Sequence, residues 1–342
     1  MISKVRLQNF RSHEDFSFEP SKTTTAIVGP NGSGKTNILE AVHTVLVGKS
    51  FRADDPALVR EGAEWSRVDL ELASGDKLSM TLDLRAGTLL KKFSKNDQPS
   101  EKPFWQLQPV VLFEPEQLRI LHGPPELRRS FVDSLVTATN PQHPDTIKRY
   151  ARALRQRNAL LKQPKARSDA FFVWDIKLSE YGSRIVAARQ AVINDINKSI
   201  TASYQKISAT DDSIRLSYET KGPDEDYASW LTAELASRRT TDQYRGFTSV
   251  GPHREDLCIW YNDSPATIRT SRGETRSIML ALKEYELSLY DNPLVLYDDV
   301  TSELDSYRSN HIQLSNQMIL TATDTIELAI EKTYPLATPP SK

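Results

Sequence analysis

Eight consecutive residues near the N-terminus have the types and spacing of a phosphate-binding loop. Positions 29–36 read G-P-N-G-S-G-K-T, which fits the pattern G-x-x-x-x-G-K-T. In such a loop, glycines let successive N–H groups point at phosphate oxygens, the lysine reaches the β- and γ-phosphates, and the threonine hydroxyl binds Mg²⁺. We therefore predict an ATP site formed by Gly29, Pro30, Asn31, Gly32, Ser33, Gly34, Lys35 and Thr36.

A pair of carboxylates in the second half of the chain is the next candidate for chemistry. The apolar run 294–297 ends in Asp298 and Asp299. The first carboxylate would hold Mg²⁺ opposite Thr36, and the second stands where a general base or a water-positioning group is needed. On its own, this pattern also fits a plain strand end. Together with the upstream loop it favours nucleotide hydrolysis, with Asp299 and Lys35 as catalytic residues.

The residues on either side of the loop predict the two elements that such a loop needs. Residues 23–28 form a β-branched, apolar run that is typical of a buried strand. Residues 37–47 predict a helix, and Gly48 is placed to cap its C-terminus. The apolar side chains of this helix share one face, as the spacing i, i+3, i+4, i+7 and i+8 requires: Ile38, Ala41, Val42, Val45 and Leu46.

Hydrophobic periodicity divides the rest of the chain into three successive parts. Residues 1–122 would be one lobe of an ATPase head, residues 123–210 a helical arm and residues 211–342 a second lobe. Positions seven apart in the arm predict a narrow packing seam between two helices; they are Leu178, Ile185, Val192 and Ser199. Predicted strands lie at 2–10, 16–18, 68–72, 78–84, 109–113, 214–218 and 257–261, and predicted helices at 144–162, 172–207 and 275–289.

Composition is that of a globular protein in water, and we expect a cytoplasmic one. Of 342 residues, 38 % are hydrophobic and 26 % are charged, and no run of apolar residues is long enough to span a membrane. The N-terminus does not read as a signal peptide, and a single cysteine, Cys258, fits a reducing compartment. Because the net charge is −1, any surface for nucleic acid must come from local clustering of basic residues.

A second anion-binding helix end is predicted upstream of the carboxylate pair. Positions 270–276 read T-S-R-G-E-T-R and precede a helix, so that Ser271 and Gly273 could bind a phosphate, although an ordinary helix cap also fits. The sequence S-E-L-D follows the carboxylate pair at residues 302–305. The order of these motifs is that of an ABC-type ATPase head, in which Ser and Gly of one subunit complete the nucleotide site of the other.

At this point the sequence resembles the RecF family of bacterial DNA repair proteins. The resemblance implies an α/β P-loop NTPase of the ABC/SMC-head type with an inserted helical hairpin arm. It also implies an ATP-dependent homodimer that binds single- and double-stranded or gapped DNA and cooperates with RecR and RecO in placing RecA. The motifs that support it span residues 2–324: N-F-R at 9–11, the loop with I-L-E-A, K-S-F-R at 49–52, F-E-P-E at 113–116, R-R-S-F-V-D at 128–133, V-G-P-H-R-E-D-L at 250–257, and D-D-V with S-E-L-D.

Some residues depart from the family pattern. Glu274 stands where glutamine is more usual and adds a charge near a presumed phosphate site. Gln117 stands where an acidic residue is more usual; it would sense the metal, or it lies on the surface. Residues 321–324 read T-A-T-D and contain no histidine, which resembles RecF more than transporter ATPases.

For several basic residues the sequence supports two interpretations, one functional and one structural. Arg52 would link DNA binding to the nucleotide, as in SMC-type heads, or is a solvated arginine. Arg11 lies beside the nucleotide or only ends a strand, and His253 is best explained as a hydrogen-bonded structural residue because it lacks partner metal ligands. A basic helix face that either contacts DNA phosphates or is merely solvated contains Lys148, Arg152, Arg155 and Lys162, with Arg149 and Arg157 beside it.

The predicted activity is slow ATP hydrolysis that DNA stimulates. Asp299 reaches less far than the glutamate that is usual in fast ATPases, so it should hold water less well. Three alternatives remain at the level of the sequence: an ATPase subunit of an ABC-type transporter, a phosphotransferase, and a DNA-binding scaffold without useful hydrolysis.

Overall fold

The computed structural model describes residues 1–163, 167–223, 225–299, 316–324 and 329–337. By its contacts the chain divides into two compact units, Met1–Gln117 with Tyr290–Lys342, and Leu118–Leu289. Residues 211–289, which we assigned to the second ATPase lobe from chain order, thus belong by their contacts to the same unit as the arm. The S-E-L-D motif at 302–305 lies outside the described residues.

The first unit contains a parallel sheet that includes the three strands predicted to carry the site. All of its pairings are parallel, so the carboxyl ends of these strands meet at one edge of the sheet. The strands 23–28, 109–113 and 293–299 were predicted from their apolar runs, and each forms close to its predicted place. In spatial order the strands are β14 (Lys332–Pro335), β3 (Thr24–Val28), β13 (Met318–Ala322), β12 (Leu294–Tyr297) and β8 (Val110–Phe113).

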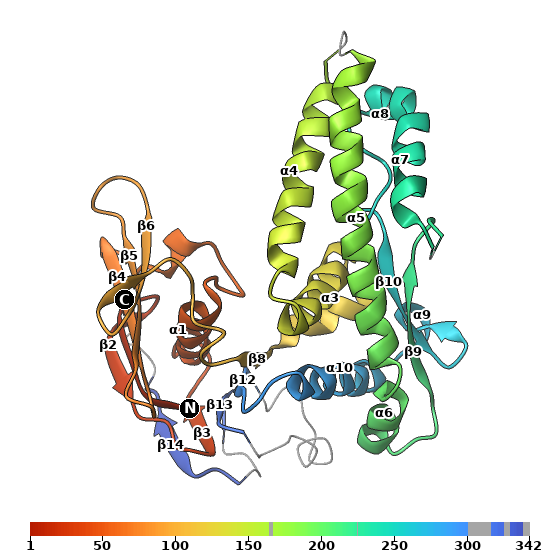
Figure 1. The fold of residues 1–342 in the computed structure, drawn as a ribbon. Coiled ribbons are helices and arrows are strands. Elements are labelled where there is room, and N and C mark those ends of the chain that lie inside the picture. The colour runs from red at the N-terminus through yellow and green to blue at the C-terminus, as the bar shows by residue number, and fades with distance from the viewer. Residues whose placement is uncertain (164–166, 224, 300–315, 325–328, 338–342) are drawn as a thin grey trace. The chain divides into compact units, whose positions relative to one another are not determined.

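An antiparallel sheet and helix α1 (Lys35–Val47) also belong to the first unit (Figure 1). Helix α1 packs against both sheets, because one hydrophobic cluster contains side chains of the helix and of each sheet. A short 3-10 helix, η1 (Asp55–Leu58), follows α1, and another, η2 (Pro115–Leu118), follows β8. The antiparallel strands, in spatial order, are β2 (His13–Phe18), β1 (Ile2–Phe10), β4 (Trp65–Leu72), β5 (Lys77–Asp83), β6 (Leu90–Lys95) and β7 (Gln98–Ser100).

The second unit is mostly helical and includes a small antiparallel sheet. The sheet has the order β11 (Ser264–Pro265), β10 (Asp256–Tyr261) and β9 (Ile214–Glu219). Among the described residues, no helix combines the length and the apolar character that crossing a membrane requires. The helices are α2 (Arg119–His122), α3 (Pro125–Thr139), α4 (His143–Leu161), α5 (Ser168–Ile196), α6 (Ile200–Ser208), α7 (Tyr227–Ser237), α8 (Arg239–Arg245), α9 (Ala266–Arg269) and α10 (Arg272–Ser288).

The predicted hairpin arm is formed by α4 and α5, with α7 packed along α5 as a third helix (Figure 1). Leu178, Ile185 and Val192 of the predicted seam are buried, and α7 adds buried leucines to the same cluster. The seam ends before Ser199, because the predicted helix 172–207 is divided there into α5 and α6.

Candidate functional site

The predicted loop leaves the C-terminal end of β3 and enters the N-terminus of α1. Gly32 and Gly34 have φ angles of 82° and 91°, which side chains other than glycine rarely adopt. Gly29 is required for a different reason, since a Cβ atom there would lie 2.5 Å from the carbonyl oxygen of Leu336. The loop therefore takes the conformation that its glycine spacing predicts.

Lys35, the first residue of α1, crosses back over this loop. Its Nζ atom donates to the carbonyl oxygens of Gly29 at 2.7 Å and Pro30 at 3.0 Å. The side chain is buried, so the amine stays at the mouth of the loop, where phosphate oxygens would arrive.

Thr36, the residue after Lys35, connects the loop to the second half of the sequence. The hydroxyl of Thr36 donates to the carboxylate of Asp298 at 2.9 Å, although these residues are 262 positions apart. The hydroxyl of Thr321, in β13, donates to the same carboxylate oxygen at 2.7 Å, a partner that sequence reasoning did not assign. A hydroxyl and a carboxylate at hydrogen-bond distance are hard oxygen donors of the kind that Mg²⁺ prefers, so these residues fit the predicted metal. Among the described residues, no cluster of three or more His, Cys, Asp or Glu side chains forms a protein-only metal site.

Two further predicted residues flank Asp298. Asp299 has a φ of 52°, and its backbone N–H donates to the Thr321 hydroxyl at 2.8 Å. Gln117 lies in η2, directly after β8, and β8 pairs with β12 so that Phe113 is opposite Tyr297. The Asp298 N–H donates to the carbonyl oxygen of Phe113 at 2.8 Å. Helix η2 therefore begins two residues after a direct backbone partner of Asp298.

The turn that follows β1 contacts both the phosphate-binding loop and the segment that follows α1. The guanidinium of Arg11 donates to both carboxylate oxygens of Glu40, at 2.9 and 2.7 Å, and to the carbonyl of Ala57. Glu40 is completely buried within α1 and also accepts from Ser50 at 2.5 Å. Every guanidinium nitrogen of Arg11 thus has a partner inside the protein.

The same turn reaches the loop through its next two residues. The Asn37 amide donates to the Ser12 hydroxyl at 2.9 Å, and His13 Nε2 lies 3.0 Å from the carbonyl oxygen of Gly34. Burial lowers the pKa of His13, so its neutral form is favoured here. Arg52 is exposed, and its backbone N–H donates to Ser50, so the position of its segment depends on Glu40 as well.

The predicted second anion-binding end is a capped helix N-terminus in the other unit. The Ser271 hydroxyl accepts from the backbone N–H of Glu274, and the Glu274 carboxylate accepts from that of Ser271 at 2.6 Å. The pKa of Glu274 lies below its usual value chiefly because of this backbone hydrogen bond. Gly273 follows in the first turn of α10. The ordinary helix cap that we weighed against a phosphate site is therefore present.

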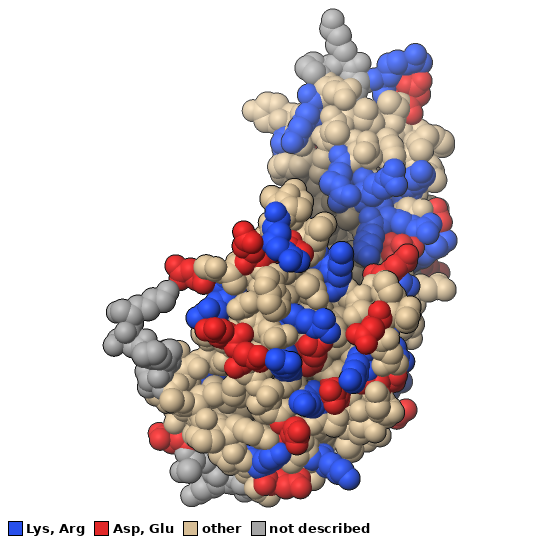
Figure 2. Space-filling model, turned by 90° about the vertical axis from the view of Figure 1, so that its left-hand side faces the viewer, with Lys and Arg blue, Asp and Glu red and all other residues tan. Residues whose placement is uncertain are grey.

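The predicted basic face of the arm is exposed along α4. Lys148, Arg152, Arg155 and Lys162 are all exposed, and Figure 2 shows Lys and Arg side chains gathered over the arm in the upper part of the view. Arg149 is exposed too and pairs with Asp145. Arg157, which we placed beside this face, is instead fully buried.

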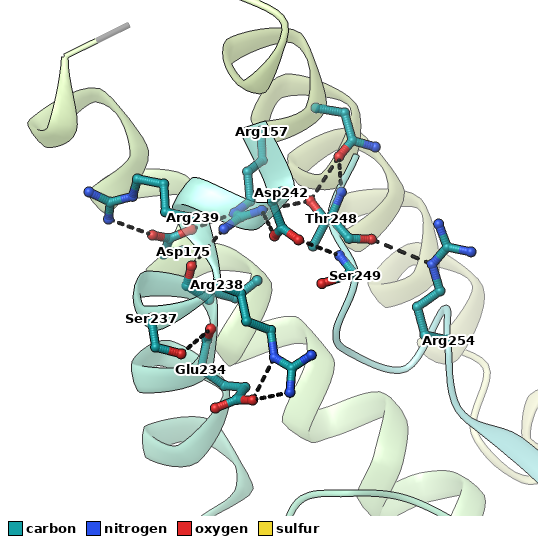
Figure 3. Close-up of polar contacts among 12 residues, drawn as sticks. Arg157, Asp175, Glu234, Ser237, Arg238, Arg239, Asp242, Thr248, Ser249 and Arg254 are labelled. Carbon is teal, nitrogen blue, oxygen red and sulfur yellow. Dashed lines mark hydrogen bonds and ion pairs between the residues drawn. The ribbon is translucent and has the colours of Figure 1, made fainter. Parts of the chain in front are cut away.

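Arg157 is the centre of a buried polar network in the arm. Its guanidinium donates to Asp175 of α5 at 2.7 Å, to Asp242 of α8 at 2.8 Å and to the Thr248 hydroxyl at 2.9 Å (Figure 3). Both aspartates are buried, and Arg239 approaches Asp175 from the other side. Arg157 can be buried in the interior of the arm because its charge stays paired with two carboxylates.

His253 has the structural role that the sequence predicted. Its Nδ1 atom lies 2.7 Å from the hydroxyl of Tyr150, and its Nε2 atom lies 3.1 Å from the carbonyl oxygen of Thr248. The carbonyl can only accept, so Nε2 carries the proton and Nδ1 accepts from the tyrosine. Burial lowers the pKa of His253 to about 4.

Comparison with known proteins places the chain among characterised families. The family model for the AAA domain matches residues 4–245. The chain is 32 % identical to the DNA replication and repair protein RecF of Symbiobacterium thermophilum, over 97 % of this chain and 93 % of the relative. It is also 32 % identical to RecF of Streptococcus uberis, over 90 % of this chain and 87 % of the relative.

Solved structures give the same answer for the fold. A structure of the recombination mediator protein RecF with ATP, from the RecFOR pathway, superposes with a TM-score of 0.88 at 26 % identity, covering 98 % of this chain and 95 % of that one. An Smc head bound to the C-winged helix domain of ScpA superposes with a TM-score of 0.57 at 17 % identity, covering 94 % and 89 %, and shares the fold. The chain belongs to the RecF family of DNA replication and repair proteins.

Proposed function

We propose that this chain is an ATP-dependent DNA-binding protein of recombinational repair. The observation that supports it most directly is the hydrogen bond between the hydroxyl of Thr36 and the carboxylate of Asp298. It joins the phosphate-binding loop to the end of the apolar strand, as a Mg²⁺–nucleotide site requires. RecF relatives that match nearly the whole chain, one of them solved with ATP, support the same nucleotide.

In this proposal the residues of the loop hold the triphosphate. Free backbone N–H groups of the loop and the N-terminus of α1 would face the phosphates, and Lys35 would leave the Gly29 and Pro30 carbonyls to bind them. Thr36 and Asp298 would hold Mg²⁺, and Gln117 would lie near it. When bound, the ion neutralises charge on the phosphate oxygens.

Hydrolysis is proposed to be slow. Asp299 is the group that would orient the attacking water, and Thr321 fixes its backbone. An aspartate reaches one methylene less far than a glutamate, so it positions water less closely. DNA would raise the rate by stabilising the state in which the site is complete.

We further propose that two copies of the chain share the nucleotide. Ser271 and Gly273 of one copy would complete the loop site of the other, which makes ATP the link between the copies in a homodimer that clamps DNA. Arg11 would support this site indirectly, because its ion pair with Glu40 holds the turn that touches Gly34.

DNA would contact exposed basic residues in both units. Arg52 follows the loop helix, and Lys148, Arg152 and Arg155 are spaced along one face of α4. Such a row neutralises phosphates without reading sequence, so both double-stranded and gapped DNA would be bound. By family membership the partners would be RecR and RecO, and through them RecA.

Light scattering coupled to size exclusion tests this proposal, with and without ATP and gapped DNA. We expect a dimer only with ATP, and more of it on DNA. Lys35→Ala should stay monomeric with ATP, because the amine that binds the β- and γ-phosphates is missing. ATP turnover with and without DNA is measured in parallel. A Lys35→Ala protein that still dimerises with ATP refutes the nucleotide switch, and turnover that DNA leaves unchanged refutes the stimulation.

A further inference from the structure

Two aromatic side chains are exposed at the end of α8, next to the basic row, which consists of Lys148, Arg152, Arg155 and Lys162. The Tyr244 side chain is 93 % exposed, and Phe247, just after the helix, is 39 % exposed. Neither belongs to the hydrophobic cluster of the arm. A single exposed aromatic residue needs no explanation, so the argument depends on what surrounds this pair.

The segment that contains these aromatics is bound to α4 along the basic row. The N–H and the hydroxyl of Thr248 both donate to the side-chain carbonyl of Asn158, at 2.9 and 2.8 Å. Asn158 lies three residues after Arg155 on α4 and four before Lys162, which directly follows the helix, so the three lie near one another at its C-terminal end. A Cβ on Gly246 would lie 3.9 Å from Cγ of Lys162. Tyr244 and Phe247 therefore lie on a strip of chain beside Arg155 and Lys162.

This strip is held in place by the buried network of Arg157. Asp242 pairs with Arg157 and accepts the N–H groups of Gly246 at 2.7 Å, through its carbonyl, and of Ser249 at 3.2 Å, through its carboxylate. Arg254 Nε lies 3.4 Å from the Thr248 carbonyl (Figure 3). The Arg254 guanidinium also lies 4.7 Å from the centroid of the Phe247 ring, a cation–π contact that orients this ring. The aromatic pair is thus presented on a fixed strip, which limits the entropy lost on binding.

The surroundings are basic with no acidic residue in the two segments that form them. Residues 146–163 and 243–254 contain no Asp or Glu. Lys148, Arg152, Arg155 and Lys162 are exposed in the first segment, and Arg245 and Arg254 in the second. A surface with cations and exposed rings, and without carboxylates, is complementary to a polyanion that has flat groups to stack.

We propose that Tyr244 and Phe247 stack on unpaired bases of single-stranded DNA whose phosphates bind the basic row. Single-stranded nucleic acid is bound by this combination, in which aromatic rings take successive bases and basic residues follow the backbone. A duplex offers the same phosphates but keeps its bases paired and stacked, so it would contact the basic row alone. The inference deepens the proposed function, on which it rests: the arm would distinguish the single strand of a gap from the duplex beside it.

The test compares the double variant Tyr244→Ala/Phe247→Ala with wild type in the full-length protein. Fluorescence anisotropy with a labelled oligo(dT) and with a duplex of equal length, at one salt concentration, gives both affinities. We expect the affinity for oligo(dT) to fall roughly 10- to 100-fold, as the loss of base stacking on aromatics predicts, and the affinity for duplex to change less than about twofold. The conservative variant Tyr244→Phe/Phe247→Tyr keeps both rings and should bind oligo(dT) as wild type does.

Two controls separate this inference from the proposed function. Phe172→Ala removes another exposed aromatic residue of the arm, 62 % exposed on α5, and should leave both affinities unchanged. Arg155→Glu/Lys162→Glu should weaken binding to both DNA forms. If charge reversal weakens both forms while the double alanine variant binds oligo(dT) normally, the stacking inference is wrong and the basic row still binds DNA. If charge reversal changes neither form, the role of the arm in DNA binding is wrong.

Discussion

Glu274 stands where the resemblance to RecF leads us to expect glutamine, and the structure shows what its charge contacts. The carboxylate closes a capping box at the N-terminus of α10 and also accepts a hydrogen bond from Tyr261 at 3.0 Å. A negative charge there is favourable within the monomer because it faces the positive end of the helix. The same charge would repel a γ-phosphate that another copy brings to Ser271.

We therefore predict that Glu274→Gln strengthens the ATP-dependent dimer. Glutamine can replace glutamate in a capping box, so the helix start is kept while the charge is removed. At an effective dielectric constant for a protein surface, relief of one such repulsion would tighten the dimer by roughly tenfold. Analytical ultracentrifugation with ATP measures this, and Tyr261→Phe, which leaves the charge in place, is the control. A dimer that is unchanged or weaker in Glu274→Gln contradicts the repulsion.

A second prediction concerns His253 and the way in which the stability of the folded protein depends on pH. The pKa of His253 in the folded protein is about 4, against an ordinary value of 6.5, because burial disfavours the charged ring. The unfolded chain binds a proton as pH falls through 6.5, whereas the folded chain does so only near 4. This contribution to stability is therefore complete above pH 6.5 and is lost progressively as pH falls towards 4.

The size of this effect follows from the two pKa values. At about 1.4 kcal/mol per pKa unit, the difference corresponds to on the order of 3 kcal/mol. NMR titration of the His253 ring measures the pKa in the folded protein, and denaturant unfolding between pH 7 and pH 5 measures the loss of stability. His253→Gln should unfold with a weaker dependence on pH. A ring that titrates near its ordinary value would show that burial does not act as described.

At the scale of elements, the arm is held together by charge as well as by apolar packing. Arg157 of α4 binds carboxylates of α5 and α8, so one side chain ties three helices. We predict that Arg157→Ala lowers the free energy of unfolding by about 3–5 kcal/mol, because two aspartates would remain buried without their cation. Arg152→Ala, on the exposed face of the same helix, should change it by less than about 0.5 kcal/mol. Equal losses in the two variants, measured by denaturant unfolding, would falsify this account.

The elements that could be predicted are those whose signal is local. Helix α1 follows from its apolar spacing and from Gly48, and strands β3, β8 and β12 follow from short apolar runs, whereas β13 and β14 were not predicted. Strands β6 and β7 could not be predicted, because L-K-K-F-S-K and Q-P-S are mostly polar and pair only as an edge of the sheet. Helices α7 and α8 were not predicted. Helix α8 reads R-T-T-D-Q-Y-R and buries only Asp242, so no apolar periodicity marks it. Helix α7 is short, and its buried Tyr227, Leu231 and Leu235 are covered by contact with α5.

The same distinction applies to the site. Thr36 and Asp298 could be paired in advance, because both belong to motifs with a known spatial relation to phosphate. Arg157 could have been predicted as buried, since it lies seven residues after buried Tyr150 and four before buried Leu161 on one helix face. The partners of Glu40 could not be predicted. Arg11 lies 29 positions before Glu40 in the sequence, and it comes after Asn9, whose left-handed backbone no local pattern indicates.

At the scale of the whole molecule, the nucleotide motifs are divided between two compact units. The loop and the carboxylate pair belong to the first unit, and Ser271 with its helix belongs to the second. A site of the proposed kind is assembled only when two copies meet on ATP, so the lifetime of the dimer would be set by hydrolysis. Asp299, the proposed water-positioning group, then acts on assembly as much as on chemistry.

We predict that Asp299→Asn lowers ATP turnover by roughly 10²- to 10⁴-fold, the usual contribution of general acid–base catalysis, and prolongs the ATP-bound dimer on DNA. The amide keeps the size of the side chain but cannot accept a proton from water. Asp298→Asn is the matched control one residue earlier: it removes charge from the proposed Mg²⁺ site beside Thr36, so both turnover and dimerisation should fail. Turnover is measured by phosphate release, and dimer lifetime by light scattering after excess ADP is added. If Asp299→Asn loses the dimer as quickly as wild type while its turnover is reduced, hydrolysis does not time the release of DNA, and the clamp must open by exchange of nucleotide.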